Sequence, residues 1–294
     1  MSKQSGYEKI TEQIVKMLEG GTIPWRKPWN AGGSLPTSLS TGKAYRGINQ
    51  MILGMVAMME GYSSPYWGTY RQITAQGGQV RKGETSTAVT LWKPFEKENA
   101  DGEMVKRFFM TTFSIFNAEQ AEWAGDMPAV PEMAEHDPIA EAEAVASAYF
   151  AEGPTFSHGG DRAYYSPAHD AIRIPEMGTF HSAEGYYSTL FHEMIHSTGH
   201  VSRLNRDGVT EGHRFGDADY SKEELVAEMG AAFLCAATGI DPESTLTNSA
   251  AYIKNWLKAL NDDPQMIVQA ASKAQKAADY AQGIGVQAEE EKAA

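Results

Sequence analysis

Hydrophobic and polar positions in the first part of the chain predict two helices followed by a β-hairpin. Apolar residues recur with helical spacing over residues 7–19, and an apolar segment of helical length covers 49–60. A glycine follows each segment, which is a common helix stop. Two β-like runs lie at 85–95 and 107–117, with a turn signal at 99–102 between them. We therefore expect an α+β unit with an antiparallel sheet.

The later part of the chain is predicted to be mainly helical with a small sheet. A hairpin is expected at 163–175, and its strand 171–174 is expected to be an edge that can pair with an extended peptide. Ser182 and Ser221 are the expected N-caps of the two helices that matter most below. Apolar spacing and stop signals place the helices at 139–150, 182–199, 221–237, 249–260 and 264–281.

A proline-containing segment separates the two parts. Residues 126–138 hold three prolines among acidic and small residues, a composition typical of a linker. We predict a first domain at 1–125 and a second at 139–294.

Charge and cysteine content narrow the class of protein. Residues 1–95 hold eleven Lys/Arg and five acidic residues, a net charge of +6, whereas the whole chain carries −13, so the remainder carries −19. This asymmetry indicates two domains with different partners. The single cysteine, Cys235, rules out an internal disulfide and a cysteine-based zinc finger and fits a reducing cytoplasm. No apolar run is long enough to cross a membrane, so we expect a cytoplasmic protein; its oligomeric state is left open.

The sequence His192-Glu193-Met194-Ile195-His196 carries the chemistry of the second part. On a helix, residues i and i+4 share a face, so the two imidazoles can point at one cation. Glu193 would then accept a proton from water that the metal activates, which makes it the expected catalytic residue of a metal-dependent peptidase.

A third protein ligand is expected on a later helix. Glu224 and Glu228 are spaced i and i+4 among small residues that allow close helix packing. We assign Glu224 as the ligand and Glu228 as the acceptor that orients an imidazole, with the reverse order also open. Two simpler interpretations are a capping box at Ser221 and Glu224 and a solvated Glu228. The expected cofactor is one divalent metal; this donor set favours zinc, although manganese also suits it.

Several neighbouring residues are weighed for supporting roles. The metzincin class needs a third histidine at position 202, which is Ser202, so that class is excluded. His200 is interpreted as a loop residue or as a residue that supports a ligand. Candidates for the donor that stabilises a developing oxyanion are Tyr186, Tyr187, His213, Arg214 and Tyr220.

Aromatic and cationic side chains are interleaved in the first domain. Bases of a single strand can stack on such aromatics while cations follow the phosphates, and no duplex-reading motif is present. The alternative is that these aromatics form a core and the cations only solvate it. The candidate residues for binding single-stranded DNA are Trp25, Arg26, Lys27, Trp29, Lys43, Tyr45, Arg46, Tyr70, Arg71, Arg81, Lys82, Trp92 and Lys93.

Motifs along nearly the whole chain resemble the ArdC-type antirestriction proteins of conjugative plasmids. In the first part they are residues 23–29 (IPWRKPW), 41–49 (TGKAYRGIN), 77–84 (GGQVRKGE) and 116–117; in the second part they are 192–200 (HEMIHSTGH), 203–206 (RLNR) and 223–228 (EELVAE). The resemblance implies a single-stranded-DNA-binding domain, shared with some plasmid primases, followed by a zincin-like metallopeptidase domain. It also implies a role in protecting incoming plasmid DNA from host restriction.

Three functional hypotheses compete on the sequence alone. The first is a DNA-binding antirestriction protein with a peptidase-like metal site, whose protein substrate is unknown. The second keeps DNA binding but makes the metal site structural, without proteolysis. The third is an acidic DNA mimic that binds restriction enzymes directly, motivated by the charge of −19 beyond residue 95.

Overall fold

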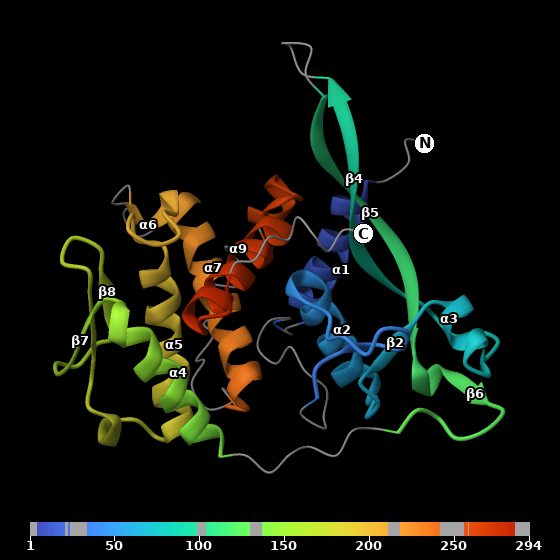
Figure 1. Cartoon of the computed structure of the whole chain (residues 1–294), viewed down its shortest axis with the longest axis horizontal. Helices are drawn as coiled ribbons and strands as arrows, with labels where there is room; N and C mark the ends of the chain where they lie inside the picture. Colours follow the sequence, from blue (N-terminus) through green and yellow to red (C-terminus); the bar gives the residue numbers. More distant parts are fainter. Residues whose placement is uncertain are drawn as a thin grey trace.

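The N-terminal part consists of a small curled sheet with helices against it (Figure 1). The computed structural model describes residues 5–20, 23, 34–98, 104–129, 137–210, 218–241, 256–257 and 259–285. The elements of the N-terminal part are α1 (Gly6–Glu19), β1 (Thr37–Ser38), α2 (Gly47–Glu60), β2 (Tyr66–Gly68), α3 (Tyr70–Ala75), β3 (Gly78–Val80), β4 (Thr87–Glu98), β5 (Met104–Asn117), the 3₁₀ turn η1 (Ala118–Gln120) and β6 (Ala121–Trp123).

The sheets of this part are mostly antiparallel, as the sequence predicts. The main sheet has the strand order β1-β2-β5-β4, in which only the short β1–β2 pair is parallel, and β3 pairs with β6 in a second antiparallel sheet. Leu53 of α2 packs against Trp67, Val89 and Ile115 of the sheet, and all four side chains are fully buried. The apolar run of α2 therefore covers one face of the sheet.

Strands β4 and β5 form an arm that projects beyond the rest of the molecule (Figure 1). Their pairing is continuous from Thr87–Ile115 near the body to Glu98–Met104 at the far end. The predicted hairpin is confirmed and is longer at both strands than expected; the predicted turn at 99–102 lies outside the described residues. From residue 91 outward the side chains of β4 are exposed.

The C-terminal part is a bundle of helices flanked by a three-stranded sheet (Figure 1). A short 3₁₀ turn, η2 (Met177–Thr179), connects the sheet to the central helix. The other elements are α4 (Pro138–Glu152), β7 (Thr155–His158), β8 (Tyr164–Ser166), β9 (Ala171–Ile174), α5 (Ala183–Thr198), α6 (Asp207–Thr210), α7 (Ala218–Thr238) and α9 (Met266–Ala281).

Strand β9 lies in the centre of its sheet, so the expectation that residues 171–174 form a free edge is wrong. It pairs in parallel with β7 and antiparallel with β8. The turn between residues 164 and 174 predicts the pairing of β9 with β8. It does not predict the pairing with β7, which comes earlier in the chain and lies on the opposite side of β9 from β8. Both hydrogen-bonding edges of β9 are occupied, so this strand cannot capture a peptide by strand addition.

The ends of the two long helices follow their capping signals to different degrees. Ser182 caps α5 as predicted, since its hydroxyl accepts a hydrogen bond of 3.0 Å from the Gly185 amide. Helix α7, however, begins at Ala218, so Ser221 lies inside its first turn rather than at the N-cap. The capping-box interpretation of Ser221 and Glu224 is therefore wrong, and Glu224 is left for another role.

The hydrophobic core continues from the first part of the chain into the second. Helix α9 packs against α1 and α2 as well as against α5 and α7. The Gly47 amide donates to Gln275 Oε1 over 2.9 Å, and Arg46 forms an ion pair with Asp279. Ile14 and Phe191 belong to the same buried cluster. The boundaries at 126–138 stay a prediction, because residues 130–136 lie outside the described part.

No helix within the described ranges combines the length and the hydropathy that crossing a membrane requires.

Arg203 connects the small sheet to the C-terminal end of α5. Its Nη1 donates to Asp170 Oδ2 over 2.9 Å, and its Nε donates to the Ser197 carbonyl over 2.8 Å. Ser197 Oγ in turn shares a 2.7 Å hydrogen bond with Tyr149 OH of α4. Asp170 also accepts from Tyr165 OH over 2.9 Å. The Arg203 guanidinium therefore joins the β8–β9 turn to α5, and the Ser197 hydroxyl joins α5 to α4.

Asp170 is expected to stabilise the fold in a pH-dependent way. The Arg203 hydrogen bond and that of Tyr165 hold the pKa of Asp170 below its usual range, although burial acts in the opposite direction. A lowered native pKa adds stability above the unfolded value of about 3.9, and this is lost as the pH falls through the native value. We expect Asp170→Asn to lower the free energy of unfolding by about 1–2 kcal/mol at pH 7.

Urea unfolding at pH 7 and at about pH 3 measures this effect, and the deficit of Asp170→Asn should shrink at the lower pH. Both residues tolerate the left-handed backbone at this position, where φ is 44°, so the substitution tests the charge. Asp161→Asn, at an exposed position, is the matched control. A deficit that is the same at both pH values would contradict the assignment.

Candidate metal centre

Two histidines one turn apart on α5 face the same point. Leu190, Phe191 and Ile195 are buried in the core on the other faces of α5, and this packing fixes the rotation of the helix about its axis. The Nε2 atoms of His192 and His196 lie 3.1 Å apart, and both side chains are partly exposed. The helical spacing of H-E-x-x-H therefore produces the converging pair that the sequence predicts.

Glu224 of α7 approaches this pair from the neighbouring helix. Its Oε1 lies 3.3 Å from His196 Nε2, and its Oε2 lies 3.7 Å from His192 Nε2. One ligand atom from each of the three residues lies within 4.8 Å of the other two. Two imidazole nitrogens and a carboxylate oxygen form a donor set that suits a divalent cation. The residues present therefore fit a single metal ion.

A glycine allows α7 to come so close to α5. A Cβ atom on Gly230 would lie 2.8–2.9 Å from three atoms of the Ile195 side chain, closer than real side-chain contacts allow. Ile195 is fully buried and has no room to move. A larger residue at position 230 would separate the helices that carry the histidines and Glu224.

Glu223, which the sequence analysis does not single out, lies behind His196. Its Oε1 is 3.4 Å from His196 Nδ1, on the far side of the ring from Glu224. Arg206 holds this carboxylate with two hydrogen bonds, Nε to Oε2 at 3.0 Å and Nη2 to Oε1 at 2.5 Å. The same guanidinium donates to the Ile195 carbonyl over 2.7 Å and to Thr198 Oγ1 over 2.6 Å.

The Arg206–Glu223 pair is almost fully buried and joins α7 to the end of α5. A buried carboxylate needs a partner of opposite charge. Glu223 and Glu224 are consecutive on a helix and so point in different directions, which was a sequence signal that they have different partners. The partner, 17 residues earlier in the chain, could not be identified from spacing.

Two carboxylates dominate the electrostatics at His196. Burial by itself lowers the pKa of His196. The hydrogen bonds and negative charges of Glu223 and Glu224 have the larger, opposite effect and raise that pKa to about 10. Burial would raise the pKa of Glu223, yet the hydrogen bonds from His196 and Arg206 outweigh it and hold that pKa low. The two carboxylates thus favour a positive charge at this point.

The other residues weighed for this site lie in different surroundings. Glu193 is buried on α5, with 8% of its surface exposed. Glu228 is half-buried one turn beyond Glu224; the three-residue cluster found among the described residues does not include it, and its role stays a prediction. The Tyr186 and Tyr187 hydroxyls bond His158 and Glu143, over 2.8 and 2.7 Å.

The four other candidates for supporting roles are His200, His213, Arg214 and Tyr220. His200 lies in the loop after α5, where its Nδ1 is 2.8 Å from Ser202 Oγ. His213 and Arg214 lie outside the described residues, as does the side chain of Tyr220.

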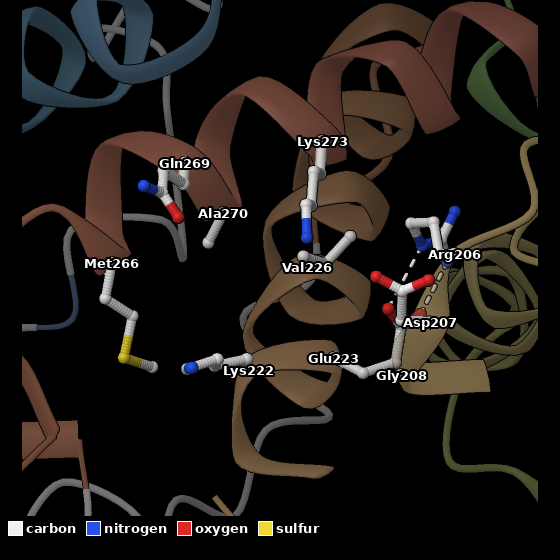
Figure 2. A pocket seen from close by; sticks show the side chains of 10 residues that line it. All are labelled: Arg206, Asp207, Gly208, Lys222, Glu223, Val226, Met266, Gln269, Ala270 and Lys273. Atoms are coloured by element: carbon white, nitrogen blue, oxygen red, sulfur yellow. Dashed lines mark hydrogen bonds and ion pairs between the residues drawn. The ribbon is translucent and has the colours of Figure 1, made fainter. Parts of the chain in front are cut away.

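A cavity of about 320 Å³ lies next to the Arg206–Glu223 ion pair, between α7 and α9 (Figure 2). Arg206 and Glu223 line one side of it, and Lys222, Met266 and Lys273 line the others. His192, His196 and Glu224 are not among its lining residues, so this cavity is separate from the candidate metal centre.

The predicted DNA-binding residues are spread over the N-terminal part. Lys43, Arg71 and Lys82 are exposed on three different segments, whereas Tyr45 is partly buried against the core of Leu53, Trp67, Val89 and Ile115. Others are bound to neighbours, in that Arg46 pairs with Asp279 of α9, Arg81 with Glu84, and Tyr70 OH with Gln79. Trp92 and Lys93 lie on the arm. The remaining four, Trp25, Arg26, Lys27 and Trp29, lie outside the described residues.

Two family models match the chain, one in each part. Residues 4–116 match the N-terminal domain of the anti-restriction factor ArdC, and residues 140–273 match a zincin-like metallopeptidase.

Relatives of known sequence cover almost the whole chain. The uncharacterized protein y4eC of Sinorhizobium fredii (strain NBRC 101917 / NGR234) is 38% identical over 93% of this chain and 90% of its own length. DNA primase TraC of Escherichia coli is 39% identical over 95% of this chain, but the match spans only 27% of that primase.

Solved structures of the ArdC antirestriction protein from plasmid R388 share the whole fold. The metal-free form is 40% identical, with a TM-score of 0.75 over 95% of this chain and 97% of the other. The Mn(II)-bound form is 39% identical, with a TM-score of 0.76 over 97% and 99%. With its two domain matches in order and full-length similarity, the chain belongs to the ArdC family of antirestriction proteins, with a zincin-like metallopeptidase domain.

Proposed function

We propose that this protein binds one divalent cation through His192, His196 and Glu224, and uses Glu193 as the general base of a peptidase site. Its N-terminal part binds single-stranded DNA, and the two activities together protect incoming plasmid DNA from restriction. The observation that carries the proposal is the meeting of three metal-ligand side chains from α5 and α7. Because its proposed partner is DNA entering a cell, the protein acts in the cytoplasm.

The donor set and the family support zinc and manganese as the candidate metals. Two histidines and a glutamate form the ligand set of many zinc peptidases, which favours zinc. The same nitrogen and oxygen donors accept manganese, and the R388 protein has been solved with Mn(II) bound.

The protein residues divide the work of such a site between them. A bound cation supplies Lewis acidity, which polarises a peptide carbonyl and makes water more acidic. Glu193, one position after His192 on α5, accepts a proton as the general base. Glu223 accepts from His196 Nδ1 and so presents Nε2 toward the cation, and Arg206 holds Glu223 in place.

Single-stranded DNA is the proposed partner of the basic N-terminal part. Its net charge of +6 over residues 1–95 suits a polyanion, and exposed aromatics such as Tyr70 and Phe109 suit unpaired bases. The similarity to part of a DNA primase supports an interaction with DNA.

A structural metal site is the second candidate, because the proposed ligands come from two helices and a cation between them would join α5 to α7. In that case the protein would bind DNA and metal without cleaving a peptide. The two functions differ in what they require of Glu193.

Glu193→Gln separates these two functions. The amide cannot accept a proton but leaves all three proposed ligands intact, so metal content should stay unchanged while protection of transferred plasmid DNA falls at least about 100-fold. The measurements are metal analysis and conjugation efficiency into a restricting recipient. Glu141→Gln, at an exposed position on α4, is the control. Full protection by Glu193→Gln would favour the structural metal site.

Glu223→Gln tests which carboxylate supports the metal ligands. The substitution keeps the shape but removes the charge beside His196, so we expect the affinity for Mn²⁺ and Zn²⁺ to fall about 10- to 100-fold. Isothermal titration calorimetry measures it, with near-ultraviolet circular dichroism to check the fold. Glu228→Gln is the comparison, because a loss there and not at Glu223 would identify Glu228 as the orienting residue.

Fluorescence polarisation with oligonucleotides tests the DNA partner. We expect the full-length protein to bind a single strand more tightly than a duplex of the same sequence. Its affinity should decrease linearly with the logarithm of salt concentration, with a slope of about −0.7 per phosphate neutralised. Equal affinity for both forms, or no binding at low salt, would exclude this part of the proposal.

A further inference from the structure

The projecting β4–β5 arm exposes aromatic side chains that no core covers. Phe95 is 38% exposed and Phe109 is 47% exposed, and their rings meet edge to face with centroids 5.8 Å apart. Exposed apolar side chains gathered in one place usually mark a binding surface. The arm therefore carries a feature that folding does not explain.

The strand register sorts the side chains of the arm onto two faces. Residues directly opposite each other, and residues two apart on one strand, share a face. Lys93 is opposite Phe109, and Phe95 is opposite Arg107, so these four lie together. We call this the Phe95 face; it consists of Leu91, Lys93, Phe95, Lys97, Val105, Arg107, Phe109 and Thr111. The opposite Phe108 face includes Trp92, Glu96, Glu98, Lys106 and Phe108.

The two faces differ in charge. Over residues 91–98 and 104–111, which the structure describes, the Phe95 face holds three cations and no carboxylate. The Phe108 face over the same residues holds two carboxylates and one cation. On the Phe95 face each phenyl ring is also directly opposite a cation on the other strand. On the Phe108 face the ring of Phe108 is opposite Pro94, and its cation neighbour is Lys106 of the same strand, whose ammonium lies 5.9 Å from the ring centre.

Helix α1 covers the base of the Phe108 face. The Tyr7 ring packs edge-on against Trp92, with centroids 6.2 Å apart, and Gly6 lies against Met110. Toward the body, the Phe95 face leads instead to Phe113, which packs against the same small core as Tyr45. Only the Phe95 face therefore combines exposed rings, positive charge and a path to the body of the N-terminal part.

We infer that the Phe95 face is the stacking platform of the protein for single-stranded DNA, with bases on Phe95 and Phe109 and phosphates on Lys93, Lys97 and Arg107. Charge complementarity identifies a polyanion as the occupant, and exposed rings beside the cations select one with unpaired bases, because a duplex hides the faces of its bases. This inference rests on the proposed binding of single-stranded DNA. It also reassigns Trp92, one of the predicted DNA-binding residues, to the contact with α1.

The register supplies a matched pair of variants that tests the face directly. Phe109 and its neighbour Phe108 are the same residue type, on the same strand, with similar exposures of 47% and 41%, but they lie on opposite faces. In the full-length protein we expect Phe109→Ala to weaken binding of a fluorescent oligothymidylate about 5- to 150-fold, and Phe95→Ala to act similarly. Phe108→Ala should change the affinity less than about twofold.

Salt dependence separates stacking from phosphate contacts. Arg107→Gln should make the slope of log affinity against log salt shallower by about 0.7, whereas Phe109→Ala should leave that slope unchanged. Lys106→Gln, on the other face, is the control for Arg107→Gln. Circular dichroism confirms folding of each variant.

The outcomes distinguish the inference from the proposed function. If the wild-type protein does not prefer a single strand, the DNA-binding function itself fails. If the wild type binds a single strand but Phe95→Ala and Phe109→Ala bind as tightly as Phe108→Ala, the function stands and the Phe95 face is excluded. Equal weakening by Phe108→Ala and Phe109→Ala would also overturn the assignment to one face.

Discussion

The close contact between α5 and α7 is the constraint on which the candidate metal centre depends. Gly230 against Ile195 sets how near the two helices come, and the buried ion pair of Arg206 and Glu223 fixes how they are aligned. Removing one partner of such a buried pair typically costs about 3–5 kcal/mol, because the other charge is left without compensation. Since α5 carries both histidines and α7 carries Glu224, the geometry of the three proposed ligands follows from the contact between these two helices.

The two arginines of the segment 203–206 hold the C-terminal end of α5 against its neighbours. Arg206 joins the end of α5 to α7, while Arg203 joins it to the β8–β9 turn through Asp170. Both guanidinium groups also donate to backbone carbonyls near the end of α5, at residues 195 and 197, where a helix leaves its carbonyls unpaired. A short loop therefore stabilises the helix terminus and holds it between two neighbours.

Much of the fold could be predicted because its signals are local. The apolar periods of α1, α2 and α5, the Ser182 cap and the β4–β5 hairpin all depend on residues close together in the chain. The predictions that were wrong concern long-range or boundary features. The position of β9 depends on pairing with β7, and the start of α7 at Ala218 was misjudged because Ser221 resembled a cap. The interleaved aromatics of the first domain were predicted as one set, although the fold distributes them over several segments.

The sequence by itself determined that two imidazoles converge, because H-E-x-x-H on a helix needs only the helical repeat to bring them together. It also identified Glu224 as a candidate partner, since two carboxylates on an apolar helix need a reason to be there. Only the tertiary structure decided that Glu223 supports His196, because its partner Arg206 is distant in the chain. The same holds for the two faces of the arm, since cross-strand register decides which ring lies beside which cation, and register is a property of paired strands rather than of either strand alone.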